Sequence, residues 1–413
     1  MVFLSWSYFL LPRKLYTINL GKWNSCLNIF KEDKTMLNVS CIGIGNAGSQ
    51  VAALAGDKLH IPVLAINSSE KDIETLPKSC PHILIGDEKG AGKERSAAKL
   101  FLKSSIINIL SDEKAEEVLK ADVIFVISST GGGTGSGTAL MMANIIQEIY
   151  ASAQVILIGI LPTLKEAYST QINTVAYMEE LYKTLGDDTT YMIYDNEKLA
   201  KLPSTVMMSK INQAIVEDID VIRGSFQYPT RFSSIDEKDA TNIISTPGRI
   251  VIASLRNLKE KDLDDTTIEN LLIEQFKTNA HCEIQRDKIV KRTGLISLLS
   301  ERLNETLDTH LAQTQKFLGA PTEEFEHIVV HNERQMENAV FLIAAGMSQI
   351  NDRIRRINDR IMEIDEQQSA AKKDDDELSS MNLAELSAKV TRRTARDASD
   401  NVDVREIMAK FGV

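Results

Sequence analysis

The sequence is poor in cysteine, and it has no apolar run of the length that crosses a bilayer. Its 413 residues include four scattered cysteines, Cys26, Cys41, Cys80 and Cys282. Cysteines without paired spacing indicate free thiols in a reducing cytoplasm, not a disulfide framework or a zinc site. Since a membrane-spanning helix needs about 20 apolar residues, we expect a cytoplasmic protein with no integral membrane contact and no dedicated metal site.

Basic residues are in the minority. The chain carries 47 lysines and arginines against 58 aspartates and glutamates, which gives a net charge of -11. Because phosphate contacts need clustered Lys and Arg, an acidic chain is a poor candidate for direct binding to nucleic acid. We therefore expect no direct, unassisted contact with nucleic acid. The length suits two domains plus tails.

Residues 1–35 differ in character from the rest of the chain. The first residues are apolar and aromatic and lack the basic start of a secretory signal. Met36 then precedes the first strong strand, so the favoured hypothesis is an upstream start codon that leaves a disordered extension. A membrane-surface segment and an added structural piece remain open alternatives.

From residue 37 onward, apolar strands alternate with helical stretches. The run 122–128 is continuous and β-branched, as expected of a strand buried on both faces. This alternation predicts an α/β fold with a doubly wound parallel sheet over residues 36–204. The predicted strands are 37–44, 61–66, 82–85, 122–128, 155–161 and 191–194.

A long central helix is predicted over 205–224, within a connecting segment that we bound at 205–228. Its apolar residues recur every three or four positions and form one buried stripe. The stripe consists of Met208, Ile211, Ile215, Ile219 and Ile222.

A smaller α+β domain is predicted over 229–347. Its expected strands are 249–255, 327–331 and 339–345, and its expected helical segments lie near 266–277 and 294–318.

The remainder, residues 348–413, is predicted as a helical tail with a linker. An isoleucine seam indicates a short helix packed on the body or on a neighbour. A charged linker at 369–380 and two weak amphipathic pieces, 381–390 and 402–411, complete the tail. The seam consists of Ile350, Ile354, Ile357, Ile361 and Ile364.

Two glycine-rich loops follow two of the predicted strands. The first runs from Gly43 to Gly48, and the second, GGGTGSG, runs from Gly131 to Gly137. Glycine lets the backbone approach an oxyanion closely, and amide groups at a helix start then point at phosphate. Both loops therefore predict phosphate binding.

The first loop alone also matches the dinucleotide fingerprint of nicotinamide oxidoreductases. That fingerprint includes an Asp or Glu after the second strand to bind the ribose, and this chain has Asn67 there. A nicotinamide enzyme has no need of a second glycine-rich loop, and a Walker loop would need a Lys that is absent here. The oxidoreductase therefore stays a remote alternative.

The GGGTGSG run resembles the signature of the tubulin/FtsZ superfamily, and further similar pieces extend from about residue 37 to 347. The resemblance implies a GTPase that binds GTP or GDP with Mg²⁺ on the phosphates. By resemblance, the phosphate-side residues are Gly45, Asn46, Gln50, Asn67, Gly90, Ala91, Gly92, Gly131, Gly132, Gly133, Thr134, Gly135, Ser136 and Gly137.

The resemblance also implies residues for the sugar and the base. Glu166 matches the ribose contact, Asn196 matches a guanine reader, and Asp220 matches the acid that pairs with guanine N–H groups. Asn196 as a helix N-cap is an open alternative. The family often adds an Arg shortly after the Glu, where this chain has residues 169–171 as Ser-Thr-Gln.

Two acids follow the predicted central helix. Asp236 and Asp239 are three residues apart, so they share one face of a starting helix. A capping box formed by Ser234 and Glu237 explains the same segment without catalysis. By resemblance, this segment enters the GTP site of the next subunit, and the acids position the attacking water.

The predicted function is thus an assembling GTPase that forms head-to-tail filaments, for segregation or positioning of plasmid or phage DNA. An FtsZ-like division protein is the first alternative, and a non-hydrolysing relative is another. The end of the chain, residues 404–411, is predicted either to bind a partner such as an adaptor or to be a frayed terminus.

Overall fold

The computed structural model describes residues 37–185, 188–224, 237–263, 266–284, 289–307, 311–331 and 337–380. The chain forms two compact units, Met1–Ile357 and Asn358–Val413. The sheet and the candidate site belong to the first unit. None of the described helices is long and apolar enough to cross a membrane.

A ten-stranded sheet runs through the first unit in the order β3-β2-β1-β4-β5-β6-β7-β10-β8-β9. Pairing is parallel from β3 to β7, antiparallel on both sides of β10, and parallel between β8 and β9. The strands are β1 Val39–Ile44, β2 Val63–Asn67, β3 His82–Leu84, β4 Val123–Ser129, β5 Gln154–Leu161, β6 Thr190–Asp195, β7 Gly248–Leu255, β8 Val290–Leu299, β9 Pro321–His331 and β10 Ala339–Met347.

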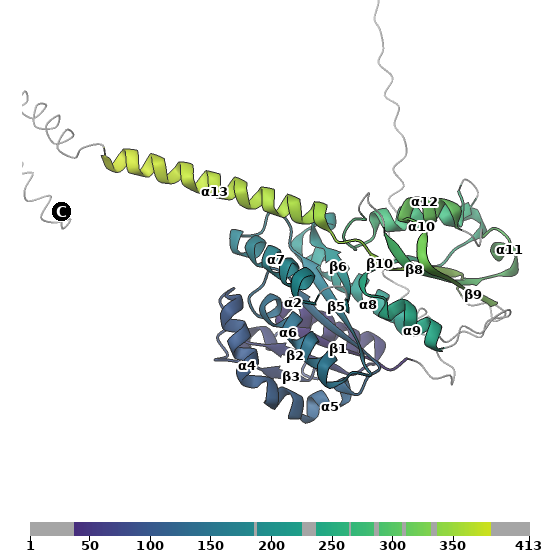
Figure 1. Ribbon diagram of the computed structural model, residues 1–413, viewed down its shortest axis with the longest axis horizontal. Helices are drawn as coiled ribbons and strands as arrows, with labels where there is room; N and C mark the ends of the chain where they lie inside the picture. The colour runs from purple at the N-terminus through teal and green to yellow at the C-terminus, as the bar shows by residue number, and fades with distance from the viewer. Residues whose placement is uncertain are drawn as a thin grey trace, which may run out of the picture. The chain divides into compact units, whose positions relative to one another are not determined.

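Helices connect these strands and cover both faces of the sheet (Figure 1). The α-helices are α2 Gly45–Leu59, α3 Glu70–Ile73, α4 Arg95–Ser111, α5 Glu113–Leu119, α6 Thr134–Ile149, α7 Tyr168–Glu180, α8 Ser204–Gly224, α9 Glu237–Ser245, α10 Ile268–Thr278, α11 Glu301–Asn304, α12 Ala312–Leu318 and α13 Asn351–Ser380. Short segments of other helix types are η1 Leu181–Leu185, η3 Asn196–Leu199 and η4 Glu260–Leu263.

Strand β4 shows why the parallel half of the sheet forms. Its residues are buried up to Ser128. Phe125 and Ile127 belong to the core under α2 and α8, whereas Ile124 and Val126 belong to the core under α4, α5 and α6. A continuous β-branched run therefore contributes side chains to the hydrophobic cores on both faces of the sheet, which confirms the prediction for this strand.

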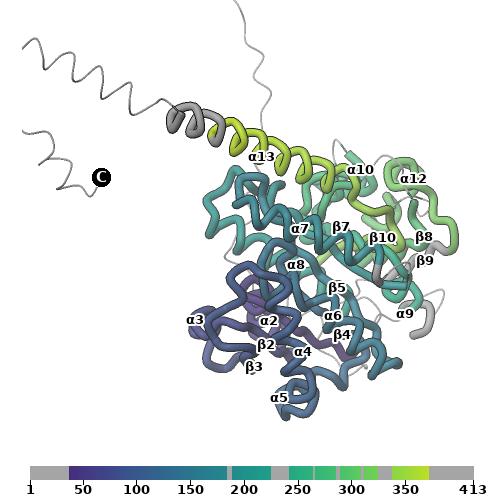
Figure 2. The backbone as a smooth tube through the Cα atoms, turned by 60° about the vertical axis from the view of Figure 1, so that its left-hand side comes forward, coloured from purple at the N-terminus to yellow at the C-terminus, as the bar shows by residue number. Residues whose placement is uncertain are grey.

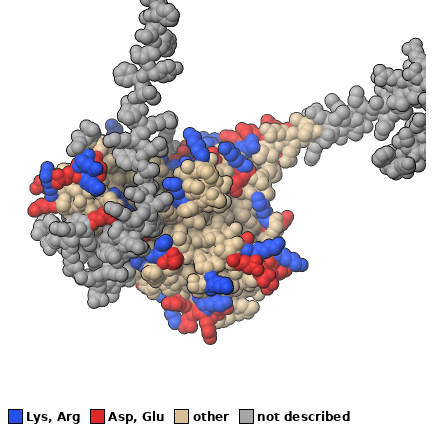
Figure 3. Space-filling view, turned by 180° about the vertical axis from the view of Figure 1, so that it is seen from behind, with Lys and Arg blue, Asp and Glu red and all other residues tan. Residues whose placement is uncertain are grey.

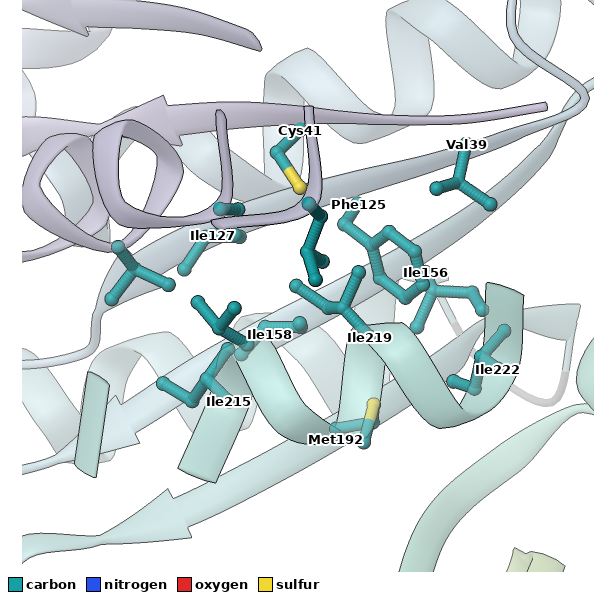
Figure 4. Packing of buried hydrophobic residues seen from close by; sticks show 14 of the residues in the cluster. Val39, Cys41, Phe125, Ile127, Ile156, Ile158, Met192, Ile215, Ile219 and Ile222 are labelled. Atoms are coloured by element: carbon teal, nitrogen blue, oxygen red, sulfur yellow. The ribbon is translucent and has the colours of Figure 1, made fainter. Parts of the chain in front are cut away.

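The central part of the first core lies between α8 and the sheet. Ile215, Ile219 and Ile222 of α8 point toward Phe125 and its neighbours on β4 and β5 (Figure 4). Figure 2 follows the chain from the purple first strands to the green second half, with α8 between them. This helix therefore packs against the parallel half of the sheet along much of its length.

The predicted stripe of α8 is wrong at its first residue. Met208 is 55% exposed, and Met207 is buried in its place. Met207, Ile211 and Ile215 are spaced by four residues, so the buried face at the start of the helix is displaced by one position.

The helix predicted near 294–318 is wrong in its first part. Residues Val290–Leu299 form β8, which lies between β10 and β9. Ile296 faces one core, whereas Leu295 and Leu299 face the core under α10. The short apolar run at 294–299 is compatible with the periodicity of a helix and with that of a strand. Its pairing with two neighbouring strands makes it a strand.

The predicted linker at 369–380 is also wrong, because α13 is helical as far as Ser380. The two alanines and two lysines at 370–373 favour a helix. Within the first unit, Ile350 and Ile357 of the isoleucine seam are buried, and Ile354 packs against the core under α4 to α6.

The predicted domain boundaries stay predictions. The sheet itself continues across them, since β6 pairs with β7 through Thr190–Gly248 and Tyr191–Arg249. Residues 1–35, 381–390 and 402–411, on which further predictions were made, lie outside the described part of the chain.

We expect the stability of the chain to depend on Ile219 and not on Met208. Ile219 is fully buried in the core under α8, so Ile219→Ala should lower the free energy of unfolding by about 3 kcal/mol. Met208→Ala, the matched control on the same helix, should change it by less than about 0.5 kcal/mol. Urea unfolding followed by circular dichroism measures both. Equal losses would contradict the assignment of the buried face.

Candidate functional site

The two glycine-rich loops lie side by side at one edge of the sheet. Strand β1 leads directly into α2 at Gly45, which has a φ of 71°. Strand β4 leads through residues 130–133 into α6 at Thr134. Because β1 and β4 are parallel neighbours, the two helix N-termini point their free amide groups toward the same space.

The loops are in direct backbone contact. A Cβ atom on Gly45 would lie 3.0 Å from the Gly135 nitrogen, and one on Gly135 would lie 2.8 Å from the Ile44 oxygen. A Cβ atom on Gly48 would lie 2.1 Å from the Ile127 oxygen. Only glycine fits these positions, so the sequence of both loops is set by their close approach.

A third loop, which contains Gly90, Ala91 and Gly92, packs on the second. A Cβ atom on Gly133 would lie 2.8 Å from the Lys93 Cα atom. The Asn173 side-chain amide donates to the Lys93 carbonyl at 2.9 Å and to the Gly132 carbonyl at 3.2 Å. The structure therefore brings together three of the predicted phosphate loops.

Lys93 is a site residue that the sequence prediction missed. Its ammonium donates a 2.7 Å hydrogen bond to the Thr170 hydroxyl. Thr170 in turn packs against Gly131, where a Cβ atom would lie 2.3 Å from the Thr170 methyl carbon. A positive charge thus lies next to the glycine run. The only signal in the sequence was the Lys that follows Gly90-Ala91-Gly92.

The side chains of Asn67 and Gln50, two of the predicted phosphate-side residues, form hydrogen bonds within the protein. The Asn67 carbonyl oxygen accepts from the Ser68 and Ser69 amides at 2.8 and 3.3 Å. The Gln50 amide donates to the Thr75 hydroxyl at 2.8 Å. Both side chains therefore shape the surroundings of the loops.

Two other side chains lie at the same edge. The Ser68 hydroxyl bonds the Thr134 hydroxyl at 2.7 Å and links the second strand's loop to the glycine run. Asn46, at the start of α2, is exposed.

The predicted sugar and base residues follow β5 and β6, at the same edge as the glycine loops. Glu166 is exposed, and its carboxylate accepts from the Thr163 amide at 2.9 Å. Asn196 opens η3, but the N-cap of that helix is Asp195, which accepts from the Glu197 amide at 3.0 Å. The N-cap alternative for Asn196 is therefore wrong.

Asp220 is not near the glycine loops. Its carboxylate lies 3.6 Å from the Arg223 guanidinium, which donates to the Leu59 carbonyl. Leu59 ends α2, a helix of 15 residues that begins at Gly45, so this carbonyl is about 20 Å from the first loop. Burial raises the pKa of Asp220, and Arg223 opposes that shift. The predicted guanine contact is therefore corrected, and Asp220 belongs to a buried pair near the far end of α2.

The polar residue of α8 that lies closer to the loops is Asn212. Its side chain is half-buried. It lies in the N-terminal half of α8, the helix that packs against η3. Sequence reasoning missed it because Asp220 offered the more familiar chemistry.

Known proteins share this arrangement. The model of the Tubulin/FtsZ family GTPase domain matches residues 38–203. The tubulin-like protein CetZ of Pyrococcus horikoshii is 28% identical over 248 residues, which are 57% of this chain and 65% of that protein. The tubulin-like protein TubZ of Clostridium botulinum C phage is 26% identical over 161 residues, 38% of this chain and 44% of that protein.

Residues 38–203 of this chain thus match the GTPase domain of the Tubulin/FtsZ family, and the chain is similar to CetZ and TubZ proteins. A solved structure of the same fold is the GTPγS-bound protofilament of CetZ2 from Haloferax volcanii. It has a TM-score of 0.61 and 17% identity, and the likeness covers 79% of this chain and 99% of that one. The sequence matches span less than two thirds of the length of the CetZ and TubZ relatives.

The predicted catalytic acids are only partly described. Asp236 lies outside the described residues, and Asp239 lies in α9 with its side chain not described. Just beyond α9, the Thr246 carbonyl accepts from the Thr190 hydroxyl at 3.2 Å, at the amino end of β6. Helix α8 likewise ends close to Leu59. The elements on both sides of residues 225–236 therefore end at the edge opposite the glycine loops.

No group of three or more His, Cys, Asp or Glu side chains able to hold a metal ion occurs among the residues that the structure describes. Among the described residues, Cys41, Cys80 and Cys282 are free and buried.

Proposed function

We propose that this chain binds and hydrolyses GTP and polymerises head-to-tail into filaments, with each active site completed by the next subunit. The observation that carries the proposal is the separation between the glycine loops and the elements that flank residues 225–236. Glycine loops lie at one edge of the sheet, and the elements flanking the acid segment end at the opposite edge. If copies of this chain stack in one direction, the edge of one copy that carries the glycine loops meets the opposite edge of the next copy. Such a contact between two different surfaces is a heterologous interface.

The phosphates would occupy the space between the N-termini of α2 and α6. Amides of the Gly45 and Gly131–Gly137 loops would donate to the phosphate oxygens, with the two helix dipoles adding to the attraction. Lys93 would contact the terminal phosphate, because its ammonium lies beside the glycine run. Mg²⁺ would be held mainly by phosphate oxygens and water.

The nucleoside would lie toward β5, β6 and α8. Glu166 would bond the ribose, and Asn196 and Asn212 would read the guanine. A side-chain amide can donate to the guanine carbonyl and accept from its ring N–H. The two amides therefore replace Asp220 in the proposed recognition of the base.

The reaction is attack of water on the terminal phosphorus, which breaks its bond to the bridging oxygen and yields GDP and phosphate. Asp236 and Asp239 of the next subunit would orient that water and accept its proton. The site is then complete only in an assembled pair, and loss of the phosphate would weaken the contact.

The proposed role is segregation or positioning of plasmid or phage DNA, with an adaptor that reads the C-terminal tail. The match to a TubZ of phage origin supports this role. Blue and red side chains are interspersed on the face in Figure 3, and the net charge of -11 favours indirect contact with DNA. An FtsZ-like division role is the alternative. A dinucleotide oxidoreductase is disfavoured by the family match.

Turnover should depend on assembly. With GTP, phosphate release per molecule should rise once the protein concentration passes the threshold at which light scattering appears, and ATP should not replace GTP. Asp236→Ala should lower turnover by about 100-fold or more and leave GTP binding unchanged. Glu116→Ala, an exposed acid on α5, serves as the control. Flat specific activity, a preference for ATP, or GTP binding without any turnover would contradict the proposal.

Lys93 should distinguish GTP from GDP. Lys93→Ala should raise the Kd for GTP about tenfold and leave the Kd for GDP within about twofold, because only GTP carries the phosphate that Lys93 would contact. Displacement of a fluorescent nucleotide below the assembly threshold measures both constants. Lys89→Ala, in the same loop, is the control. An equal loss for both nucleotides would show that Lys93 only supports the loop.

Recognition of the base should depend on Asn212 and not on Asp220. Asn212→Ala should lower the preference for GTP over ATP about tenfold, since the guanine would lose a hydrogen-bonding partner. Asp220→Asn should leave that preference unchanged, because the Asp220 pair lies near the far end of α2. Competitive displacement by GTP and by ATP gives the ratio. A loss in Asp220→Asn alone would instead favour Asp220 as the residue that reads the base.

A further inference from the structure

A buried arginine at the start of α13 connects two of the loops around the candidate site. The Arg353 side chain is 0% exposed, and its partner Asp195 is 3% exposed. Arg353 Nε donates to Asp195 Oδ2 at 2.7 Å, and Arg353 Nη2 donates to Asp195 Oδ1 at 3.1 Å. The same Nη2 atom donates to the Pro162 carbonyl at 2.7 Å. One guanidinium therefore holds a carboxylate in two places and a backbone carbonyl in a third.

The two partners of Arg353 begin the loops that we assign to the sugar and the base. Pro162 directly follows β5, and Asp195 is the last residue of β6 and caps η3. We call the hydrogen bonds of Arg353 to Asp195 and Pro162 the Arg353 clamp. Since β5 and β6 are paired neighbours, this clamp fixes the first residues of both loops relative to each other. Arg353 itself lies 158 residues further along the chain than Asp195.

Further hydrogen bonds carry this constraint outward. The Glu197 carboxylate accepts from the Leu164 amide at 2.7 Å, which joins η3 to the loop after β5. Gln171 of α7 donates to the Thr163 carbonyl at 2.7 Å. These two hydrogen bonds thus fix the segments that contain Glu166 and Asn196. Arg353 is the charged group that holds the first residues of both segments.

The neighbouring arginine of α13 provides a contrast. Arg356, one turn further along, forms an ion pair with Glu283 in which both side chains are nearly half exposed. Exposed pairs of this kind contribute little, whereas loss of one partner from a buried pair leaves an uncompensated charge. Arg353 and Arg356 therefore form a matched pair for a test.

We propose that Arg353 is a positioning residue for the nucleoside half of the site, so that docking of the first turn of α13 and nucleotide binding favour each other. The inference rests on the proposed function, because it needs GTP to lie on the loops after β5 and β6. Coupling of this kind is reciprocal. Bound nucleotide would hold the first turn of α13 in place, and release of that turn would weaken nucleotide binding.

The test uses Arg353→Lys in the full chain. Lysine keeps the positive charge but cannot hold Asp195 in two places and Pro162 in a third at once. The KM for GTP and the Kd for GDP should both rise about tenfold, while kcat at saturating GTP should stay within about twofold. Arg356→Lys should leave all three values unchanged. GDP affinity is measured below the assembly threshold, so that filament formation does not contribute.

A purely structural role gives a different result. In that case Arg353→Lys would lower the melting temperature and the fraction of molecules that bind nucleotide, with unchanged KM and Kd, and the inference would be overturned. If Arg353→Lys does not fold, Asp195→Asn gives a second variant of the same clamp with the same expected rise in KM. Wild-type protein that binds neither GTP nor GDP would refute the proposed function itself.

Discussion

The contact between the two glycine loops is the constraint on which the rest of the structure depends. Gly45 and Gly135 meet at the carboxyl ends of paired parallel strands, at a distance that excludes any side chain. Two helix N-termini are thereby directed at one space, and a highly charged anion is the ligand that their free amides and dipoles suit. The third loop, Lys93 and Asn173 then complete the rim of that space.

The position of this contact at one edge of the sheet determines how the molecule would work. Helix α8 leads from the carboxyl edge, beside η3, to the opposite edge beside Leu59. The elements that flank residues 225–236 end at that opposite edge, so on the proposed function a single chain would hold GTP and the groups that position water at separate places. On the proposed function, hydrolysis and assembly would be coupled, since a second copy would supply the other half of the site. The Arg353 clamp would add the start of α13 to the set of elements that respond to the nucleotide.

The sequence predicted the parallel strands and the glycine loops well, because both depend on local patterns. A buried β-branched run such as β4 and a glycine at positive φ such as Gly45 leave signals within a few residues. Asp220 could not be placed in the same way. Isoleucines recur along α8 at spacings of three and four, so a shift by a turn or two along the helix preserves the stripe and leaves the position of an acid ambiguous.

Strand β8 and the Arg353 clamp were missed for another reason. The apolar part of β8, residues 294–299, is short, and only the pairing of β8 with β9 and β10 distinguishes a strand from a helix. Arg353 meets Asp195 across 158 residues of sequence, a distance over which no local pattern gives information. Lys93 was missed because a lysine in a glycine turn is usually a solvated residue.

Complementation between two inactive variants tests the central claim, a site shared between subunits, most directly. Gly132→Asp would place a carboxylate in the phosphate cradle, where a Cβ atom meets only the Ser129 hydroxyl within 4 Å. Asp236→Ala removes an acid from the other half. We predict that each variant alone releases almost no phosphate, and that an equal mixture recovers activity at about a quarter of its interfaces, as a heterologous contact with random order requires. A mixture that stays as inactive as its components, or full turnover by either variant alone, would contradict the account.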